Sequence, residues 1–491
     1  MSLQFITGNS GNGKTKYLFN RIVKEAKANP RDNYLVIVPE QFTMQTQRQL
    51  VDLSENKAIM NIDVLSFKRL AYRVFDELGI TNLTVLEETG KNLVLRKLAA
   101  QEADKLGVIG RNLNRIGYIS EVKSLLSELV QYNISPEELG RYIASGRLSD
   151  TLSDKLKDVL VLYEAFEKFM QDKYITAEEI LNVLSNVAEE SAILRNSVIA
   201  FDEFTGFTPI QNQLIKKLFV ISKKIYVTLT IDCREDIFKS RGMQELFDMP
   251  KRTVKSLTEM AAFYGIEVEE PIILDKNYRL AENEELSFME QQLFRKRRCS
   301  FKKAPKHIHI DCLRDPKQEL TKIARRINEL VRNENLRYRD IAIVTGDVNI
   351  YAGYVREIFD KYNIPYFIDA TQEILFHPFI EFIRSIPDIA AQNFSADAVF
   401  RFLRCGFSEL LDSEIDVLEN YVLACGVRGK SAWDKKWVRL PKHKAGYDLE
   451  LLNQSREYIM ELLKPVYQVF SDKKSTVKDY VLAIYKLIVL L

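Results

Sequence analysis

The sequence predicts an α/β protein in which parallel β-sheets are interrupted by large all-helical insertions. Two observations predict this class. Apolar runs such as 34–38 and 197–201 have the length and composition of strands that are buried on both faces of a parallel sheet. Between these runs, residues 87–186 repeat apolar side chains at the three- and four-residue spacing of amphipathic helices. A helical segment of this length is more than a connection between strands, so we expect a separate all-α domain there.

Length, charge and cysteine usage restrict the class of protein further. A chain of 491 residues is too long for one hydrophobic core and favours roughly two to four domains. The formal net charge of +2 gives no bulk attraction to nucleic acid, so a DNA partner would need local basic surfaces. The five cysteines form no C-x-x-C pair, which favours free thiols over disulfides or a metal cage. No segment has the pattern of a secretory signal or the length of a membrane span, so we expect a cytoplasmic protein without membrane contacts.

The first strand-like run, 3–7, is followed by a glycine-rich loop and an amphipathic helix. The loop fits the pattern G-x-x-x-x-G-K-[ST] at every fixed position. Its residues, which we expect to bind a nucleotide, are Gly8, Asn9, Ser10, Gly11, Asn12, Gly13, Lys14 and Thr15. Glycines let backbone N–H groups point at phosphate oxygens, and the helix N-terminus adds its positive dipole end. Lys14 is expected at the β- and γ-phosphates and Thr15 as a ligand of Mg²⁺, so the predicted cofactors are ATP and Mg²⁺.

A P-loop ATPase also needs a second strand that ends in an acidic residue. The run 197–201 is such a strand, and Asp202 and Glu203 follow it directly. We expect Asp202 to hold Mg²⁺ and Glu203 to polarise the attacking water if ATP is hydrolysed. Taken alone, an acid pair after a strand is more often a surface feature; the P-loop favours the catalytic interpretation. Together the two motifs predict a RecA-like P-loop NTPase domain.

The P-loop and the acidic strand lie far apart in the sequence, which requires further strands and an insertion between them. Runs at 34–38 and 61–65 supply two strands, and the helical segment supplies the insertion. The expected organisation is a first RecA-like domain at 1–85 and 190–290, a helical insertion at 86–189, a basic linker at 291–304, the start of a second RecA-like domain at 305–385 and a second helical insertion at 386–491.

The last two segments rest on weaker patterns. Two short strand-like runs, 307–310 and 341–344, flank a helical pattern and predict the second sheet. The apolar run 480–491 has no polar tail, so we expect the second insertion to be truncated and the natural chain to be longer.

Two basic stretches are candidates for binding phosphate groups. Residues 295–298 lie in the expected linker, and residues 433–444 place Trp433 and Trp437 among lysines and an arginine. The alternatives are a solvated linker for the first stretch and a solvated loop for the second.

The loops after the predicted strands resemble, in order, the motifs of superfamily 1 DNA helicases of the UvrD/PcrA type. The matching segments are 8–15 (motif I), 38–43 (motif Ia), 64–71 (motif Ib), 202–204 with 209–211 (motif II) and 274–280 (motif IV). Three strings, FITGNSGNGKT, VPEQFT and DEFTGFTPIQ, more closely resemble the AddB (RexB) family of subunits of bacterial AddAB helicase–nucleases.

The resemblance implies an ATP-binding subunit of a helicase–exonuclease complex that processes double-strand DNA ends for recombinational repair. It implies an AddA-type partner subunit, duplex ends and single-stranded DNA as substrates, and scanning of the strand for the recombination hotspot Chi. A C-terminal nuclease and a 4Fe-4S cluster are expected of the full-length protein, beyond Leu491.

Some positions depart from active UvrD-type motors. Thr205 and Gly206 stand where these motors have Gln-Asp, and the segment 231–236 lacks the glutamine that senses the γ-phosphate. Arg279 matches the arginine of motif IV and is the candidate contact to the γ-phosphate, with a structural arginine as the alternative. The resemblance therefore implies an ATP-binding site whose coupling to DNA stepping is eroded.

Single-stranded DNA binding needs stacking aromatic rings beside polar and cationic groups. Two loops after predicted parallel strands offer this combination, at the edge of the sheet where ligands of α/β proteins bind. The candidate residues are Gln41, Phe42, Thr43, Ser66, Phe67 and Lys68. The alternative for each phenylalanine is a place in the core.

Three functions remain open from the sequence. The first is an AddB-type subunit that contributes strand binding to a larger complex. The second is an autonomous UvrD-like translocase, and the third is a scaffold that binds ATP and DNA without hydrolysis.

Overall fold

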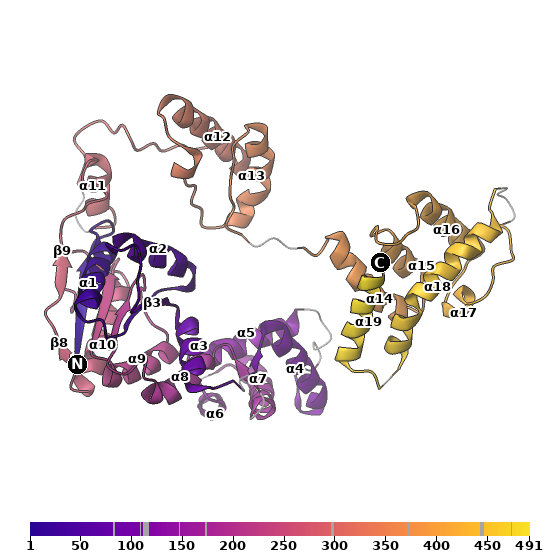
Figure 1. Cartoon of the computed structure of the whole chain (residues 1–491), viewed down its shortest axis with the longest axis horizontal. Helices are drawn as coiled ribbons and strands as arrows, with labels where there is room; N and C mark the ends of the chain where they lie inside the picture. Colours follow the sequence, from indigo (N-terminus) through magenta and orange to yellow (C-terminus); the bar gives the residue numbers. More distant parts are fainter. Residues whose placement is uncertain are drawn as a thin grey trace. The chain divides into compact units, whose positions relative to one another are not determined.

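A computed structural model of the chain describes residues 1–81, 84–108, 110, 117–146, 148–171, 174–295, 299–370, 374–441, 446–472 and 474–491. The chain divides into two units, Met1–Ile310 and Asp311–Leu491, each with its own hydrophobic cores (Figure 1). Among the described residues, no helix combines the length and the hydropathy that crossing a membrane requires.

A parallel sheet forms the centre of the first unit. Its strands are β1 (Ser2–Gly8), β2 (Tyr34–Ile37), β3 (Ile62–Leu65), β6 (Val198–Phe201), β7 (Lys224–Thr230), β8 (Glu267–Val268) and β9 (Ile272–Leu274). They lie in the order β3-β2-β6-β7-β1-β8, and β9 also pairs with β1. Every described pair is parallel. The predicted α/β class is confirmed.

Helices cover both faces of this sheet because its strands alternate their side chains between two cores. Phe5 of β1 points into one core and Ile6 into the other. The helices on the Ile6 side are α1 (Lys14–Ala28) and α2 (Thr43–Leu53), and those on the Phe5 side are α3 (Phe67–Leu78), α8 (Ile180–Val187), α9 (Pro209–Ile221) and α10 (Asp248–Phe263). Since the strands are parallel, the loops after β1, β2, β3 and β6 meet at one edge, where ligands of such sheets bind.

An all-helical insertion with a separate core interrupts the sheet. Its helices are α4 (Glu88–Gln101), α5 (Tyr118–Gln131), α6 (Pro136–Ala144) and α7 (Asp150–Met170), and two short strands, β4 (Val85–Leu86) and β5 (Ile175–Thr176), pair where it begins and ends. Ile180 and Leu184 of α8 belong to the core of the sheet domain. The insertion thus ends near β5 rather than at residue 189. Helical periodicity marks the buried face of α8 but does not say which core that face covers.

The remaining elements of the first unit are α11 (Glu284–Gln292) and the 3₁₀ helices η1 (Glu40–Phe42), η2 (Ala103–Lys105) and η4 (Ala188–Glu190). The expected basic linker begins directly after α11, and residues 296–298 of its basic stretch lie outside the described residues.

The second unit is helical throughout its described residues. Its elements are α12 (Pro316–Asn333), η5 (Tyr338–Asp340), α13 (Val348–Lys361), α14 (Pro378–Ala391), α15 (Ala396–Leu403), α16 (Asp412–Cys425), α17 (Lys430–Trp433), α18 (Leu449–Ser471) and α19 (Val477–Leu490). α12 and α13 share one core, and α14 to α19 share another. The second helical bundle therefore starts at Pro378, earlier than the expected residue 386.

Two predictions for this part of the chain differ from the structure. Neither 307–310 nor 341–344 forms a strand, because a strand is defined by its ladder of hydrogen bonds and no described segment pairs with either run. Trp433 and Trp437 lie in the core of the α14–α19 bundle, where Trp433 is fully buried, so they do not form an exposed nucleic-acid surface. The adjacent residues 442–445 lie outside the described residues.

Candidate functional site

The phosphate-binding loop connects the end of β1 to the first turn of α1. β1 ends at Gly8 and α1 begins at Lys14. Gly11 and Gly13 have φ angles of +89° and +79°, a left-handed conformation that side chains other than glycine rarely tolerate. A Cβ atom at Gly11 would also lie 2.7 Å from Asn277 Oδ1. The glycines of the sequence motif therefore meet two needs, backbone conformation and close approach of a neighbouring segment.

The segment after β9 is hydrogen-bonded to this loop. The backbone N–H of Tyr278 donates to Gly11 O at 3.0 Å, and the Asn277 side-chain amide donates to Ser10 O at 3.0 Å. Closer to β9, the Asn12 amide donates to Leu274 O at 2.5 Å. These bonds connect the predicted motif IV directly to the predicted motif I. The sequence pattern singles out the motif but not Asn277 as the residue that attaches it.

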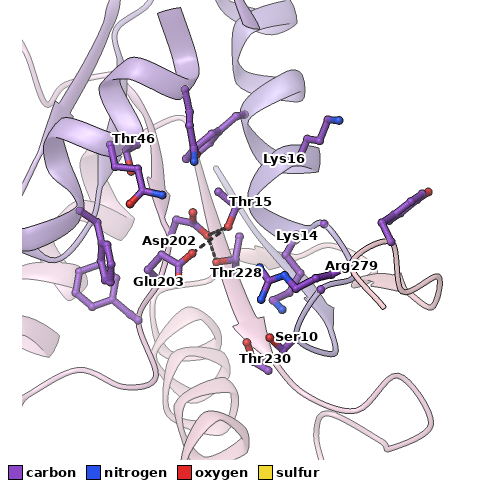
Figure 2. Close-up of a pocket in the computed structure, with 18 of the residues that line it drawn as sticks. Ser10, Lys14, Thr15, Lys16, Thr46, Asp202, Glu203, Thr228, Thr230 and Arg279 are labelled. Atoms are coloured by element: carbon purple, nitrogen blue, oxygen red, sulfur yellow. Dashed lines mark hydrogen bonds between the residues drawn. The ribbon is translucent and has the colours of Figure 1, made fainter. Parts of the chain in front are cut away.

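The acid pair follows β6 and faces the first turn of α1, as Figure 2 shows. The hydroxyl of Thr15 lies 3.3 Å from Asp202 Oδ1 and 3.3 Å from Glu203 Oε1. Thr228 of β7 also donates to Asp202 Oδ1. The structure therefore brings together the two halves of the predicted nucleotide site, which are 187 positions apart in the sequence.

Asp202 is a buried carboxylate with an unused oxygen. It is 1% exposed, and its Oδ2 atom has no hydrogen-bond partner among the described residues. Burial raises the pKa of the carboxyl group, while the hydrogen bond from Thr228 opposes that shift. A buried oxygen without a partner is costly unless something binds it, and a carboxylate beside a hydroxyl is the donor set that Mg²⁺ accepts together with phosphate oxygens. The residues present therefore fit Mg²⁺, although the described residues contain no cluster of three or more acidic, histidine or cysteine ligands.

Glu203 has a strained backbone. Its φ angle is +64°, in the left-handed region that only a few per cent of residues other than glycine adopt. Strain of this kind costs on the order of 1–3 kcal/mol and is concentrated at functional sites. Here it accompanies an exposed carboxylate at the mouth of the site, next to Thr15.

Lys14 folds back onto the loop. Its ammonium group donates to Gly8 O at 3.1 Å and to Asn9 O at 3.0 Å. Burial lowers the pKa of this group, while the carboxylates of Glu203 and Asp202 oppose that shift. An ammonium group held this way can be redirected to phosphate oxygens with little loss, since both arrangements satisfy its donors.

A cavity of about 770 Å³ opens over these residues, a volume typical of small-molecule sites. Lys14, Thr15, Asp202, Glu203 and Arg279 all line it. Further lining residues that the sequence motifs do not select are Lys16, Thr228, Thr230 and Tyr278. Tyr278 is 65% exposed and packs beside Gly13, which places an aromatic ring at the rim. The position of this tyrosine, directly before the motif IV arginine, is a signal from which sequence reasoning could have found it.

The predicted DNA-binding residues lie at the same edge of the sheet, after β2 and β3, but they differ in exposure. Gln41 and Lys68 are exposed, and Phe42 is half-buried in the wall of the cavity. Thr43 and Ser66 are buried, and their hydroxyls donate to the backbone carbonyl and the carboxylate of Glu40, respectively.

Phe67 has a core position. It is 7% exposed and contacts the rings of Phe201, Phe204 and Phe207 at centroid distances of 5.6–6.3 Å. The prediction that Phe67 stacks on bases is therefore wrong for this conformation. Core positions and exposed aromatic platforms look alike in sequence, because both are aromatic residues at the end of a strand.

The segment expected to sense the γ-phosphate, 231–236, is occupied with internal contacts. Asp232 is buried and accepts hydrogen bonds from Arg234 and from Arg295 of the expected linker. Although burial disfavours its charge, the bonds from Arg234 hold the pKa of Asp232 at about 2. Arg295 is thus engaged with the sheet domain and not free to bind phosphate.

Comparisons with known proteins add independent findings. The family described as "ADDB, N-terminal" matches residues 5–290. Bacterial proteins that are named as a subunit of an ATP-dependent helicase/deoxyribonuclease are similar over nearly the whole chain: 39% identity over 99% of the chain and 43% of the protein from Lachnoclostridium phytofermentans, 33% over 100% and 43% for Caldanaerobacter subterraneus, and 32% over 97% and 42% for Clostridium tetani. The chain therefore spans less than half the length of these relatives.

Proposed function

Since the chain belongs to the AddB family, whose N-terminal domain it contains, we propose that it is an ATP-binding, helicase-like part of a helicase–exonuclease complex acting on DNA. Its relatives are named as one subunit of such an enzyme, which supports a partner subunit of the AddA type. The proposed substrates are double-strand ends and the single strands produced from them during recombinational repair. The nuclease and the 4Fe-4S cluster remain predictions for segments that these residues do not include.

The observation that carries the proposal is the approach of Thr15 and Asp202 within one cavity. In the proposed complex the loop 8–15 binds the phosphates of ATP, and Thr15 and Asp202 hold Mg²⁺. The metal supplies positive charge next to the β- and γ-phosphates. Tyr278, exposed at the rim, is positioned to stack on the base, because every base offers a flat π-face to an aromatic ring.

For hydrolysis, Glu203 is the proposed residue that orients water and Arg279 the proposed contact to the γ-phosphate. Both line the cavity. A non-hydrolysing scaffold is the alternative that one observation favours: Asp232 and Arg234 of the segment 231–236 pair with each other instead of with the cavity. ATP turnover by the purified chain, measured with and without single-stranded DNA, separates the two. Brisk DNA-stimulated turnover contradicts the scaffold.

Scanning of the exported strand for Chi is the proposed role of the DNA-facing edge. Gln41, Phe42 and Lys68 remain the candidates there, since Gln41 and Lys68 are exposed and Phe42 is half-buried at the cavity wall. Binding of single-stranded DNA at this edge would place the strand beside the nucleotide cavity, at the same ends of the parallel strands.

The substitution Lys14→Ala tests the nucleotide site. Loss of the ammonium group is expected to weaken binding of a fluorescent ATP analogue by about 10-fold or more, because charged hydrogen bonds to phosphate contribute about 1.5–3 kcal/mol. The matched control is Lys24→Ala, which removes an exposed lysine from the same helix. Equal affinity in both variants and the wild type would contradict the proposed site. In a complex with an AddA-type partner, unwinding that survives Lys14→Ala supports the scanning role, whereas loss of unwinding supports a motor.

A further inference from the structure

β7 carries two hydroxyl groups on the face that lines the nucleotide cavity. Thr228 and Thr230 are two positions apart, so their side chains leave the strand on the same side. Thr230 is half-buried and lies near Ser10 in Figure 2, whereas Thr228 is 3% exposed and lies deeper. The remaining residues between Ile225 and Leu229 are apolar side chains or Tyr226, all of them buried.

The position of Thr228 follows from the strand register. β6 and β7 are paired in parallel with Phe201 opposite Val227, so Thr228 comes next to Asp202 just beyond the end of β6. Its hydroxyl donates a hydrogen bond to Asp202 Oδ1 (Figure 2). The second donor to this oxygen, Thr15, lies farther away, at 3.3 Å, and is the group expected to turn its oxygen towards a metal.

We propose that Thr228 is the positioning residue of the Mg²⁺ site: its hydroxyl fixes the rotation of the Asp202 carboxylate and leaves Oδ2 free for the ion or its water. This inference rests on the proposed ATP and Mg²⁺ site. Oδ2 is the buried oxygen that has no partner among the described residues. Partners that orient metal ligands in this way contribute about 10- to 100-fold to metal affinity.

The test uses the full 491-residue chain and the substitution Thr228→Val, which keeps the branched shape and removes the hydroxyl. The affinity for a fluorescent ATP analogue is measured over a series of Mg²⁺ concentrations. We expect the Mg²⁺ concentration for half-maximal enhancement to rise about 10-fold, with the affinity in the absence of Mg²⁺ unchanged. Thr228→Ser, which retains the donor, is expected to behave as the wild type.

Thr7→Val is the matched control. Thr7 lies buried on the neighbouring strand β1, and its hydroxyl has no hydrogen-bond partner among the described residues. The same chemical change there should leave the Mg²⁺ dependence unchanged. If Thr228→Val does not fold by circular dichroism, Thr228→Ala replaces it and must show the same shift of about 10-fold.

Two outcomes overturn the inference in different ways. If Thr228→Val and the wild type respond identically to Mg²⁺, Thr228 is a packing residue and the proposed nucleotide site stands. If the wild type binds no nucleotide at any Mg²⁺ concentration, both this inference and the proposed function fail.

Discussion

Phe67 shows at the scale of one residue how a helicase-like motif contributes to folding. Its ring lies among Phe201, Phe204 and Phe207, below the ends of the strands that carry the candidate DNA-binding residues. Ser66 next to it caps α3 by accepting a hydrogen bond from the Arg69 backbone N–H. The motif thus anchors a helix through an aromatic side chain and a capping hydroxyl, and its exposed part is Lys68 with Arg69.

Replacing Phe67 with alanine is expected to lower the free energy of unfolding by about 3–5 kcal/mol, the cost of removing a buried aromatic side chain. Urea denaturation followed by circular dichroism measures the change. Lys68→Ala, at the exposed neighbouring position, should stay within about 0.5 kcal/mol of the wild type. A Phe67→Ala protein of unchanged stability that no longer binds single-stranded DNA would restore the stacking interpretation.

The nucleotide residues needed little beyond the sequence. The residues from Gly8 to Thr15 are contiguous, and their conformation follows from glycine at the left-handed positions and from a strand that leads into a helix. Asp202 could be predicted because an apolar run ended in an acid. Thr228 and Asn277 could not, because each acts by contacting a segment that is distant in the sequence.

At the scale of elements, the segment after β7 is tied to the end of the sheet domain. Asp232 receives Arg234 from its own loop and Arg295 from beyond α11, and Arg234 also donates to Gln291 O at 3.0 Å. The P-loop joins this network, since the Asn9 side chain accepts from the Cys233 N–H and donates to Glu290. α11 is therefore fixed to both the phosphate loop and the β7 loop.

Asp232→Asn should destabilise the sheet domain by about 1–2 kcal/mol at pH 7, a figure discounted for the exposure of Arg234. The pKa of Asp232 is about 2, below its ordinary 3.8. A lowered pKa contributes stability that is complete above the unfolded-state value and is lost as the pH falls through the folded-state value. The gap in unfolding free energy between wild type and variant should therefore close between about pH 4 and pH 2.

Urea titrations at several pH values measure this gap. The control is Asp154→Asn, which breaks an exposed pair with Lys157 and should change stability by less than about 0.5 kcal/mol at every pH. A gap between wild type and Asp232→Asn that stays constant down to about pH 2 would show that the carboxylate charge is not what stabilises the network.

At the scale of the whole molecule, the separate cores predict separate unfolding. Trp433 is fully buried in the second unit, between Phe400 and Trp437. Its replacement by alanine should cost about 3–5 kcal/mol in that unit and lower one calorimetric transition. Affinity for an ATP analogue, a property of the first unit, should remain unchanged. A parallel fall in nucleotide affinity would mean that the two units unfold cooperatively.

The sequence by itself determined the α/β class, the phosphate loop and the acidic residue that faces it, because each depends on a short contiguous pattern. Periodicity also found the helices of the insertion, but it misplaced the border at α8, since an amphipathic helix does not specify which core it covers. The strands expected at 307–310 and 341–344 failed for a related reason: pairing depends on a neighbour and not on the run itself.

Tertiary structure alone decided which groups from distant segments meet. It placed Thr228 against Asp202, attached Asn277 to the P-loop, and buried Phe67 and Trp433 in cores. These outcomes depend on strand order and on packing between remote segments, which no local pattern encodes. Hydrogen bonds and burial are properties of pairs and clusters of residues, whereas a sequence motif reports on one stretch of chain at a time.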